Sequence, residues 1–463
     1  MRAPIALVIP FIFREGYPRK LVDEHLARMR ILIDQSGIEY DIANPVIWPT
    51  DADSVSRSFN TVQYDFSIFL IPTWIEPMLV IRAARPLLNR PVVVWGNGTF
   101  MHEGKRVNLG SLPGAGVVKG TLREMGVNHE YIYRMPGKPE DDVWILTKLR
   151  KTANVSRAIA LLEHTRIGAV GYLFGGMSIG DIDIGKLRRD LGPEIMTIDA
   201  YQIFDEMSKV KVGSPQWEAA KAEILSRLSE PLADKYLDTY VRIYAALWDF
   251  VEQEGLQALT MKCQTDFPQR FGIPPCIPLS VLGDRVVAGC EADMPVLLTE
   301  IVMYYLSGGV TPTHCDIHDV SNNRILIAAC GFAPAGACIG DRIICDLPDP
   351  NPSGLGATFN CYITNKNYLK AGRSTFARFL KDPNGNLELH FAVGESTGNV
   401  GVVSELDCPQ YAFTEIELDG DLDEFMQASG SHHYAVCNAD LKEALALFCR
   451  YKKIRCVTGG GFA

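Results

Sequence analysis

The first 160 residues alternate continuous apolar runs with amphipathic stretches. Continuous apolar strands that alternate with helices are typical of a parallel sheet covered by helices on both faces. The pattern therefore predicts an α/β domain over residues 1–160, and its first 13 residues are interpreted as a buried strand rather than a signal peptide. The segments that carry this prediction are the strand-like runs Ile5–Phe13, Phe66–Ile71 and Pro91–Trp95 and the helical pattern Pro18–Asp34.

A second α/β pattern follows over residues 161–340. Residues 215–254 are strongly helical, and Pro215 suits the first turn of a helix that begins after Ser214. A further helix is expected over Pro295–Leu306. The strand-like runs of this region are Arg166–Phe174, Glu194–Asp199, Ala258–Cys263 and Val286–Cys290.

The sequence pattern changes near residue 340, where short runs of alternating apolar and polar residues are separated by Pro, Gly, Asn and Asp. Alternation with a period of two predicts antiparallel strands, and Asp382–Gly385 has the composition of a hairpin turn. The expected fold is thus two doubly wound parallel-sheet domains, at 1–160 and 161–340, followed by an antiparallel β-barrel-like domain at 341–463. Its expected elements are strands Gly356–Thr364, Ser374–Leu380, Leu387–Val393 and Lys453–Val457 and a closing helix, Asp440–Tyr451.

Composition and charge narrow the class of protein. The chain has 463 residues, 47% of them hydrophobic and 22% charged, which is ordinary for a globular protein with several cores. The net charge of −10 disfavours a general nucleic-acid binder, because an acidic surface repels phosphates. No uninterrupted apolar stretch reaches the roughly 18 residues that a membrane span needs.

The twelve cysteines all lie after residue 260, and none belongs to a CxxC pair. A zinc ribbon or a thioredoxin-type site is therefore unsupported. Scattered cysteines in a long chain are typical of reduced thiols, so we expect a cytoplasmic location.

Two glycine-rich turns follow predicted strands. Gly96–Thr99 lies where open α/β sheets bind ligands, although an ordinary tight turn explains it equally well. Gly175–Gly180 does not fit GxGxxG, and no GxxxxGK[ST] sequence occurs in the chain. The sequence therefore predicts no nucleotide cofactor.

Acidic residues end two of the apolar runs in the second α/β region. Asp266 follows one run, and Glu291 and Asp293 follow the next. Strand ends of this kind carry catalytic groups in α/β folds, so two carboxylates there suit a shared divalent cation or an acid–base pair. The alternative is structural, since such residues also cap helices and Asp293 precedes the helix expected over Pro295–Leu306.

Two adjacent histidines, His432 and His433, lie in a small-residue loop between apolar runs. Imidazole suits Mn, Fe, Co, Ni or Zn, whereas carboxylates favour harder ions. A mixed set of carboxylates and imidazole therefore indicates Mn²⁺ or another divalent cation. A surface His-His pair without a ligand is the alternative interpretation.

The order and spacing of several motifs over residues 259–457 resemble the L-fucose isomerase / L-arabinose isomerase superfamily. The two α/β regions and the trailing β region are similar to that superfamily's three-part build. The resemblance rests on the segments Lys262–Asp266, Pro275–Asp284, Gly289–Asp293, Leu298–Glu300, Ser307–Gly308, Cys315–Asp316, Cys330–Gly331 and Gly430–His433.

The resemblance implies roles for individual residues. It implies metal binding by Asp266, by Glu291 or Asp293, and by His432, with Asp266 and Asp293 as the catalytic carboxylates. It extends more loosely to His433, His318 and Gln264 as substrate-binding residues. Two positions depart from the superfamily pattern: Asp266 stands where Glu is usual, and Ala329 stands where similar members have His before Cys-Gly.

The implied activity is interconversion of an aldose and a ketose. A divalent cation would polarise neighbouring oxygens of an open-chain sugar, and a carboxylate would move the carbon proton through an enediolate. Deoxy-, pentose and anionic sugars, sulfonated ones included, are the expected substrates. The resemblance further implies a homo-oligomer with active sites near subunit boundaries. The rival hypotheses are a non-catalytic sugar-binding protein and another metal-dependent sugar enzyme, such as an aldolase or dehydratase.

Overall fold

The computed structural model divides the chain into two compact units, Met1–Ala160 and Leu161–Ala463. Each unit is described by itself. The part of the chain that the structure describes comprises residues 1–59, 64–173, 175–230, 232, 234–329, 331–346, 364–365, 367–398, 412–458 and 461–462.

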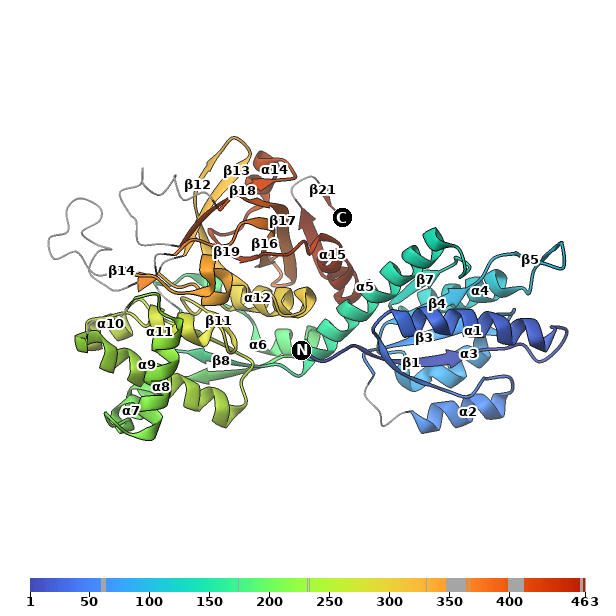
Figure 1. The fold of residues 1–463 in the computed structure, drawn as a ribbon, viewed down its shortest axis with the longest axis horizontal. Coiled ribbons are helices and arrows are strands. Elements are labelled where there is room, and N and C mark those ends of the chain that lie inside the picture. Colours follow the sequence, from blue (N-terminus) through green and yellow to red (C-terminus); the bar gives the residue numbers. More distant parts are fainter. Residues whose placement is uncertain are drawn as a thin grey trace. The chain divides into compact units, whose positions relative to one another are not determined.

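The first unit contains a five-stranded parallel sheet (Figure 1). Successive strand residues pack on opposite faces: Leu7 and Ile9 join one apolar cluster, whereas Ala6 and Val8 join another. The sheet is therefore covered on both sides, as the continuous apolar runs predict. In spatial order its strands are β2 (Glu39–Ile42), β1 (Ile5–Pro10), β3 (Phe66–Ile71), β4 (Val92–Gly96) and β7 (His129–Ile132).

Helices connect these strands, a further helix follows the last strand, β7, and a short hairpin follows β4. The helices are α1 (Arg19–Gln35), α2 (Pro49–Ser58), α3 (Pro77–Ala84), α4 (Ser111–Glu124) and α5 (Pro139–Glu163), and the hairpin pairs β5 (Phe100–His102) with β6 (Lys105–Val107).

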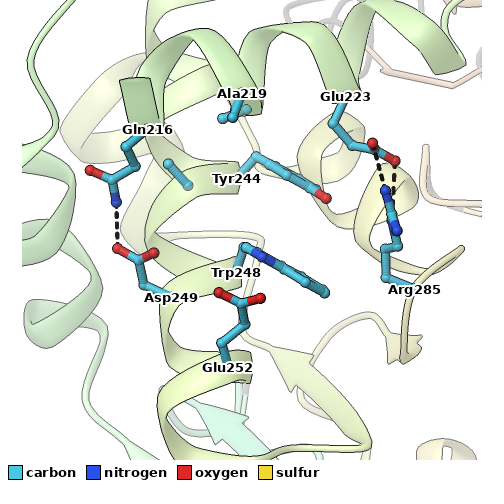
Figure 2. A pocket seen from close by; sticks show the side chains of 10 residues that line it. Gln216, Ala219, Glu223, Tyr244, Trp248, Asp249, Glu252 and Arg285 are labelled. Atoms are coloured by element: carbon cyan, nitrogen blue, oxygen red, sulfur yellow. Dashed lines mark hydrogen bonds and ion pairs between the residues drawn. The ribbon is translucent and has the colours of Figure 1, made fainter. Parts of the chain in front are cut away.

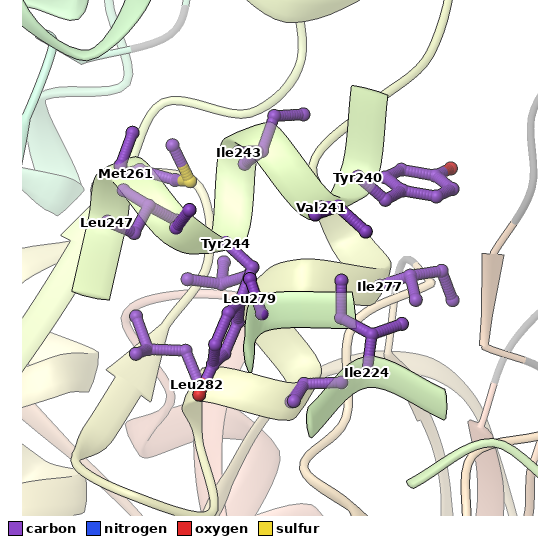
Figure 3. Packing of buried hydrophobic residues seen from close by; sticks show 14 of the residues in the cluster. Ile224, Tyr240, Val241, Ile243, Tyr244, Leu247, Met261, Ile277, Leu279 and Leu282 are labelled. Carbon is purple, nitrogen blue, oxygen red and sulfur yellow. The ribbon is translucent and has the colours of Figure 1, made fainter. Parts of the chain in front are cut away.

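The second unit begins with a four-stranded parallel sheet. The stretch expected to be helical over residues 215–254 forms two helices that pack against each other, α8 (Pro215–Arg227) and α9 (Asp234–Glu254). Figure 3 shows apolar residues of α8, α9 and α11 (Cys276–Leu282) packed together beside Met261 of the sheet. In spatial order the strands are β9 (Glu194–Ile198), β8 (Arg166–Val170), β10 (Ala258–Met261) and β11 (Val287–Gly289).

The remaining helical elements of this sheet region include α12, which follows β11 directly. They are η2 (Ser178–Gly180), α6 (Ile184–Asp190), α7 (Ala200–Lys209), α10 (Asp266–Phe271) and α12 (Met294–Ser307).

Six antiparallel strands then close into a barrel, because the first and last strands of the ring, β16 and β17, also pair with each other. The expectation of a β-barrel-like C-terminal region beside two parallel sheets is confirmed. Around the ring the strands are β16 (Gly372–Lys381), β19 (His433–Cys437), β12 (Thr313–Ser321), β13 (Arg324–Ala329), β18 (Ala412–Leu418) and β17 (Leu387–Ser396).

Two of these barrel strands, β12 and β13, precede residue 341. The domain limits near residues 160 and 340 stay predictions. The strand expected over Gly356–Thr364 lies outside the described residues except for its last residue, Thr364. Cys330 of the Cys-Gly motif also lies outside them. The other elements of this region are η3 (Ala335–Ala337), η4 (Ile339–Asp341), β14 (Cys345–Asp346), β15 (Thr364–Asn365), α14 (Leu422–Ala428), α15 (Lys442–Lys452), β20 (Arg455–Thr458) and β21 (Gly461–Phe462).

Helix α12 joins the sheet to the barrel. It packs against β10 and β11 on one side and against β16 and β19 on the other (Figure 1). Nearly all of its side chains are buried, which explains why its sequence is apolar around the whole circumference. This packing brings the carboxyl ends of the sheet strands against the barrel. Within the described residues, no helix combines the length and apolar character needed to cross a bilayer.

Candidate metal centre and active site

The turn between β11 and α12 delivers two acids to the barrel. Glu291 and Ala292 adopt left-handed backbone conformations, with φ of 62° and 56°. Such conformations are unfavourable for residues with a side chain, and they cluster at functional sites. The turn ends at Asp293, whose Oδ1 accepts a hydrogen bond from Val296 N (3.1 Å) and caps α12.

Asp293 also binds two side chains of the barrel. Its Oδ2 accepts hydrogen bonds from Arg378 Nη1 and His433 Nδ1, both at 2.9 Å, and only 2% of Asp293 is exposed. Burial alone would raise the pKa of this carboxyl, but the bond from His433 and the charge of Arg378 hold the pKa well below its usual range. Asp293 is therefore a fully bonded carboxylate.

Neighbouring barrel strands bring three further groups together. His314 and Asp316 are two residues apart on β12, so their side chains lie on the same face, and Asp316 pairs directly with His433 on β19. Asp316 Oδ1 lies 3.4 Å from His433 Nε2 and 3.7 Å from His314 Nε2. One ligand atom from each of the three residues lies within 4.8 Å of the others, so this buried group could hold a divalent metal.

The donor atoms of this group suit a cation. Both ring nitrogens of His314 and Oδ1 of Asp316 are buried, and none of them makes a hydrogen bond among the described residues. The approaches of Asp316 Oδ1 to His433 and His314 are ion-pair contacts. Buried polar atoms of this kind normally have a partner. Metal–ligand bonds of about 2.0–2.2 Å place neighbouring ligand atoms roughly 3–3.5 Å apart. The observed separations are close to that spacing, and two imidazoles with a carboxylate suit Mn²⁺, Fe²⁺, Co²⁺ or Zn²⁺.

Glu291 lies beside the group. Its Oε2 is 3.5 Å from His433 Nε2. Burial, together with the neighbouring Cys263, raises the pKa of Glu291. By contrast, the pKa of Asp316 is lowered: burial opposes this, but the imidazoles of His314 and His433 outweigh it. The site thus holds two carboxyls whose pKa values are shifted in opposite directions, a pattern found where acid–base chemistry occurs.

The protonation of His433 follows from its neighbours. Burial disfavours the charged ring, but the hydrogen bond to Asp293 and the nearby Asp316 and Glu291 outweigh burial and raise its pKa. When the ring is neutral, donation from Nδ1 to Asp293 leaves the lone pair on Nε2, the atom that faces Asp316 and Glu291.

The other site residues predicted from the sequence differ in how closely they approach the group of His314, Asp316 and His433. The ring of His432 lies against that of His433, with the ring centres 4.0 Å apart and the planes tilted by 49°, and burial and the charge of His433 lower the pKa of His432. His318 Nε2 lies 4.0 Å from Asp316 Oδ2. The amide of Gln264, just after β10, is buried without a hydrogen-bond partner among the described residues.

Asp266 begins α10, and its polar side-chain partners among the described residues belong to its own segment. Its Oδ1 accepts a hydrogen bond from Thr265 Oγ1 and forms an ion pair with Lys262 Nζ, both at 3.0 Å. The structure gives it no direct bond to His433, Glu291 or Asp293 within the described residues. The roles predicted for Asp266, Glu291, Asp293, His432, His433, His318 and Gln264 stay predictions.

Sequence reasoning missed three residues of the cluster. His314 and Asp316 alternate on a strand, and that spacing was a usable signal for a shared face. Arg378 lies in a stretch expected to be a strand, but nothing in the sequence shows that its guanidinium is buried against Asp293.

A separate hollow of about 350 Å³ lies on α8 and α9, away from the residues named above. Figure 2 shows that polar side chains in it bind each other: Gln216 donates a hydrogen bond to Asp249, and Arg285 pairs with Glu223. None of the predicted site residues lines this hollow, and Asp249, Glu223 and Arg285 in it already have side-chain partners. The chemistry-bearing groups are those around His433.

Comparison with known proteins gives a consistent set of relatives. The chain matches no family model. It is 26% identical over 377 residues to a sulfoquinovose isomerase of Alkalicoccus urumqiensis, an alignment that covers 79% of this chain and 80% of the relative. It is 27% identical over 379 residues to that of Priestia megaterium, and 24% identical over 368 residues to that of Clostridium sp. (strain MSTE9), each covering 77% of both chains. The similarity therefore extends through most of the chain.

Proposed function

We propose that this protein is a metal-dependent aldose–ketose isomerase that acts on an open-chain sulfonated sugar. One observation carries the proposal. A buried His-Asp-His group, several of whose possible metal-ligand atoms make no hydrogen bond among the described residues, adjoins the carboxylates that follow β11. It occurs in a chain that is similar over most of its length to sulfoquinovose isomerases. The name of these relatives selects a sulfonated sugar from the deoxy-, pentose and anionic classes expected from the sequence.

The cation belongs at the barrel side of the site. His314, Asp316 and His433 would hold it, and Mn²⁺ fits their mixed nitrogen and oxygen donors. When bound, the cation would polarise the two adjacent oxygens between which the isomerisation takes place. Glu291 adjoins this group, with its Oε2 3.5 Å from His433 Nε2.

Isomerisation moves one proton between C1 and C2, and the chain's carboxylates are proposed to carry it. Glu291 is suited to this task because burial raises its pKa, and a carboxyl with a raised pKa takes up a proton more readily. Asp266, the first residue of α10 after the neighbouring strand β10, is the proposed second proton carrier. Asp293 is not proposed for this step, because its two oxygens already accept three hydrogen bonds.

Polar groups around the carboxylates are proposed to orient the sugar. The buried amide of Gln264 has both a donor and an acceptor to offer to hydroxyl groups. His432 and His318 lie next to His433 and Asp316 and would contact the sugar from the barrel side. The proposal retains the homo-oligomer with active sites at subunit boundaries and the cytoplasmic location expected from the sequence, and mass photometry of the purified chain tests the assembly.

Proton NMR in deuterated water tests the activity. With Mn²⁺ and sulfoquinovose, the purified protein should produce the ketose isomer and incorporate deuterium at a single carbon, with the carbon chain intact. The Asp316→Ala variant and chelator-treated protein serve as controls and should do neither. Shortening of the carbon chain would support an aldolase and loss of water a dehydratase, while binding without turnover would support a sugar-binding protein; any of these contradicts the proposal.

A further inference from the structure

Arg378 is a buried cation that reaches the site from strand β16. Only 1% of it is exposed, and its guanidinium binds three different segments. Nη1 donates to Asp293 Oδ2 (2.9 Å) and to the carbonyl oxygen of His433 (3.1 Å), and Nη2 donates to the carbonyl oxygen of Ile179 (2.8 Å). One side chain thus ties the β11–α12 turn, the start of β19 and the η2 segment together.

From this arrangement we propose that Arg378 and Asp293 are positioning residues that orient His433, and that Asp293 is not a direct metal ligand. This inference rests on the metal centre of the proposed function, but not on the identity of the sugar. It differs from the role implied by the superfamily resemblance, which places Asp293 among the ligands.

The bonding of Asp293 carries the inference. Its Oδ1 is engaged by the backbone of α12, and its Oδ2 accepts from both Arg378 and His433. A cation on Oδ2 would lie close to a guanidinium already 2.9 Å from that oxygen, and the two positive charges would repel each other. The same carboxylate fixes the His433 ring through Nδ1, as carboxylates commonly do for metal-binding histidines.

Arg378 keeps this pair in place. A buried carboxylate needs a partner charge, and an Arg offers several donors in one rigid plane. Because Nη1 bonds to both Asp293 and the backbone of His433, Arg378 fixes the histidine from two directions. Its bond to Ile179 adds the segment that lies over Asp293, where Gly180 approaches the Asp293 Cα closely enough for an added Cβ to lie 3.5 Å away.

The decisive experiment measures Mn²⁺ affinity of the sugar-free protein by electron paramagnetic resonance. Asp293→Asn retains an oxygen that can accept from His433 Nδ1, so we expect about 10–100-fold weaker binding at full stoichiometry, the usual loss for such supporting residues. Asp316→Ala removes a ligand and should abolish measurable binding. Loss of binding in Asp293→Asn as complete as in Asp316→Ala would show that Asp293 is a ligand and overturn the inference.

Arg378 is tested with Arg378→Lys and Arg378→Met, each checked for folding by circular dichroism. Arg378→Met should weaken Mn²⁺ binding about as much as Asp293→Asn does. Arg378→Lys keeps the positive charge, so it should weaken Mn²⁺ binding less than Arg378→Met. The matched control is Lys381→Met, on the same strand, because Lys381 Nζ binds the carbonyl oxygen of Ser178. Equal affinity in wild type and Arg378→Met would refute the role of Arg378.

A spectroscopic readout covers the case in which an Arg378 variant fails to fold. In metal-free protein labelled with ¹⁵N-histidine, the neutral ring of His433 should carry its proton on Nδ1 in the wild type. Asp293→Leu should abolish that preference; a tautomer unchanged by this substitution would contradict the inference. None of these measurements uses a sugar, so an inactive protein with the expected affinities would overturn the proposed function alone.

Discussion

The two parallel sheets of this chain share a winding pattern but differ at their strand ends. In each, the first strand lies inside the sheet, the second lies at one edge, and the later strands continue on the other side. Polar side chains at the ends of the first sheet bind backbone: Thr73 accepts from Phe13 N and Ser111 accepts from Asn97 N. In the second sheet, Glu291 and Asp293 instead meet barrel side chains.

This difference teaches that strand-end topology alone does not make a site. At the second sheet, the barrel places imidazoles and a guanidinium against the strand-end carboxylates. The strongest test of this comparison therefore removes a barrel residue rather than a sheet residue.

The largest effect is expected from Asp316→Ala. It removes the shared neighbour of His314 and His433, so Mn²⁺ binding and isomerase turnover should both fall below detection. Asp319→Ala is the matched control, because Asp319 lies on the same strand and is exposed. Isothermal titration with Mn²⁺ and the NMR assay measure both properties. Equal loss in the two variants would argue against a specific centre.

Glu291→Gln tests the sheet side of the site. It removes a proposed proton carrier while keeping the size of the side chain, so kcat should fall roughly 10²–10⁴-fold. The control comes from the first sheet, where Glu130→Gln should change kcat less than about twofold. Glu130 is also a buried strand glutamate, but it is paired with Lys148 at 3.4 Å. Unchanged kcat in Glu291→Gln would refute its proposed role.

Each unit contains a buried histidine whose pKa burial lowers to about 4: His25 in the first and His390 in the barrel. The folded state keeps these rings neutral, so their contribution to stability is complete above the unfolded pKa of about 6.5 and is lost as pH falls towards 4. Lowering the pH from 7 to 5 should therefore reduce the free energy of unfolding by about 2 kcal/mol for each of these histidines. Replacement by Gln should reduce the loss in the unit that carries it, as measured by hydrogen exchange; an unchanged pH dependence would contradict this expectation.

The smallest effect concerns Glu300 of α12, which is fully buried with neither carboxyl oxygen hydrogen-bonded among the described residues. Burial raises its pKa well above the usual value, so stability is complete below the unfolded pKa and is lost as pH rises. Glu300→Leu should raise the free energy of unfolding by about 1–2 kcal/mol near pH 8. Glu130→Leu, which breaks an ion pair, should lower it. Urea unfolding compares the two, and destabilisation by Glu300→Leu would contradict the prediction.

The sequence predicts the α/β strands well because their apolar runs are continuous and end at polar turns. Runs such as Phe66–Ile71 and Glu194–Asp199 coincide with β3 and β9 almost residue for residue. The barrel strands β12, β13, β18 and β19 were not predicted. β12 and β13 form a hairpin in which Ser321 pairs with Arg324, so the Asn322–Asn323 turn between them was a local signal that went unused. β18 and β19 also pair with strands far away in the chain, β13 and β12 respectively, and such pairing leaves no local signal in the sequence.

The candidate site was predictable to a similar extent. The strand-end rule found Glu291 and Asp293, and the paired histidines pointed to the region of His433. Which residue of each pair faces the centre depends on backbone geometry, because the left-handed turn at Glu291 and the pairing of Asp316 with His433 decide it. Neither the left-handed turn nor this strand pairing can be predicted from the residue types alone.

The ring closure of the barrel has a consequence for biosynthesis. His433 begins β19, which pairs with β12 from more than a hundred residues earlier and with β16. Contacts so distant in the chain form late, because a large loop must close first. On the ribosome, the strand-end acids are therefore made long before their histidine partner, and the group of His314, Asp316 and His433 can assemble only after nearly all residues of the chain have been translated.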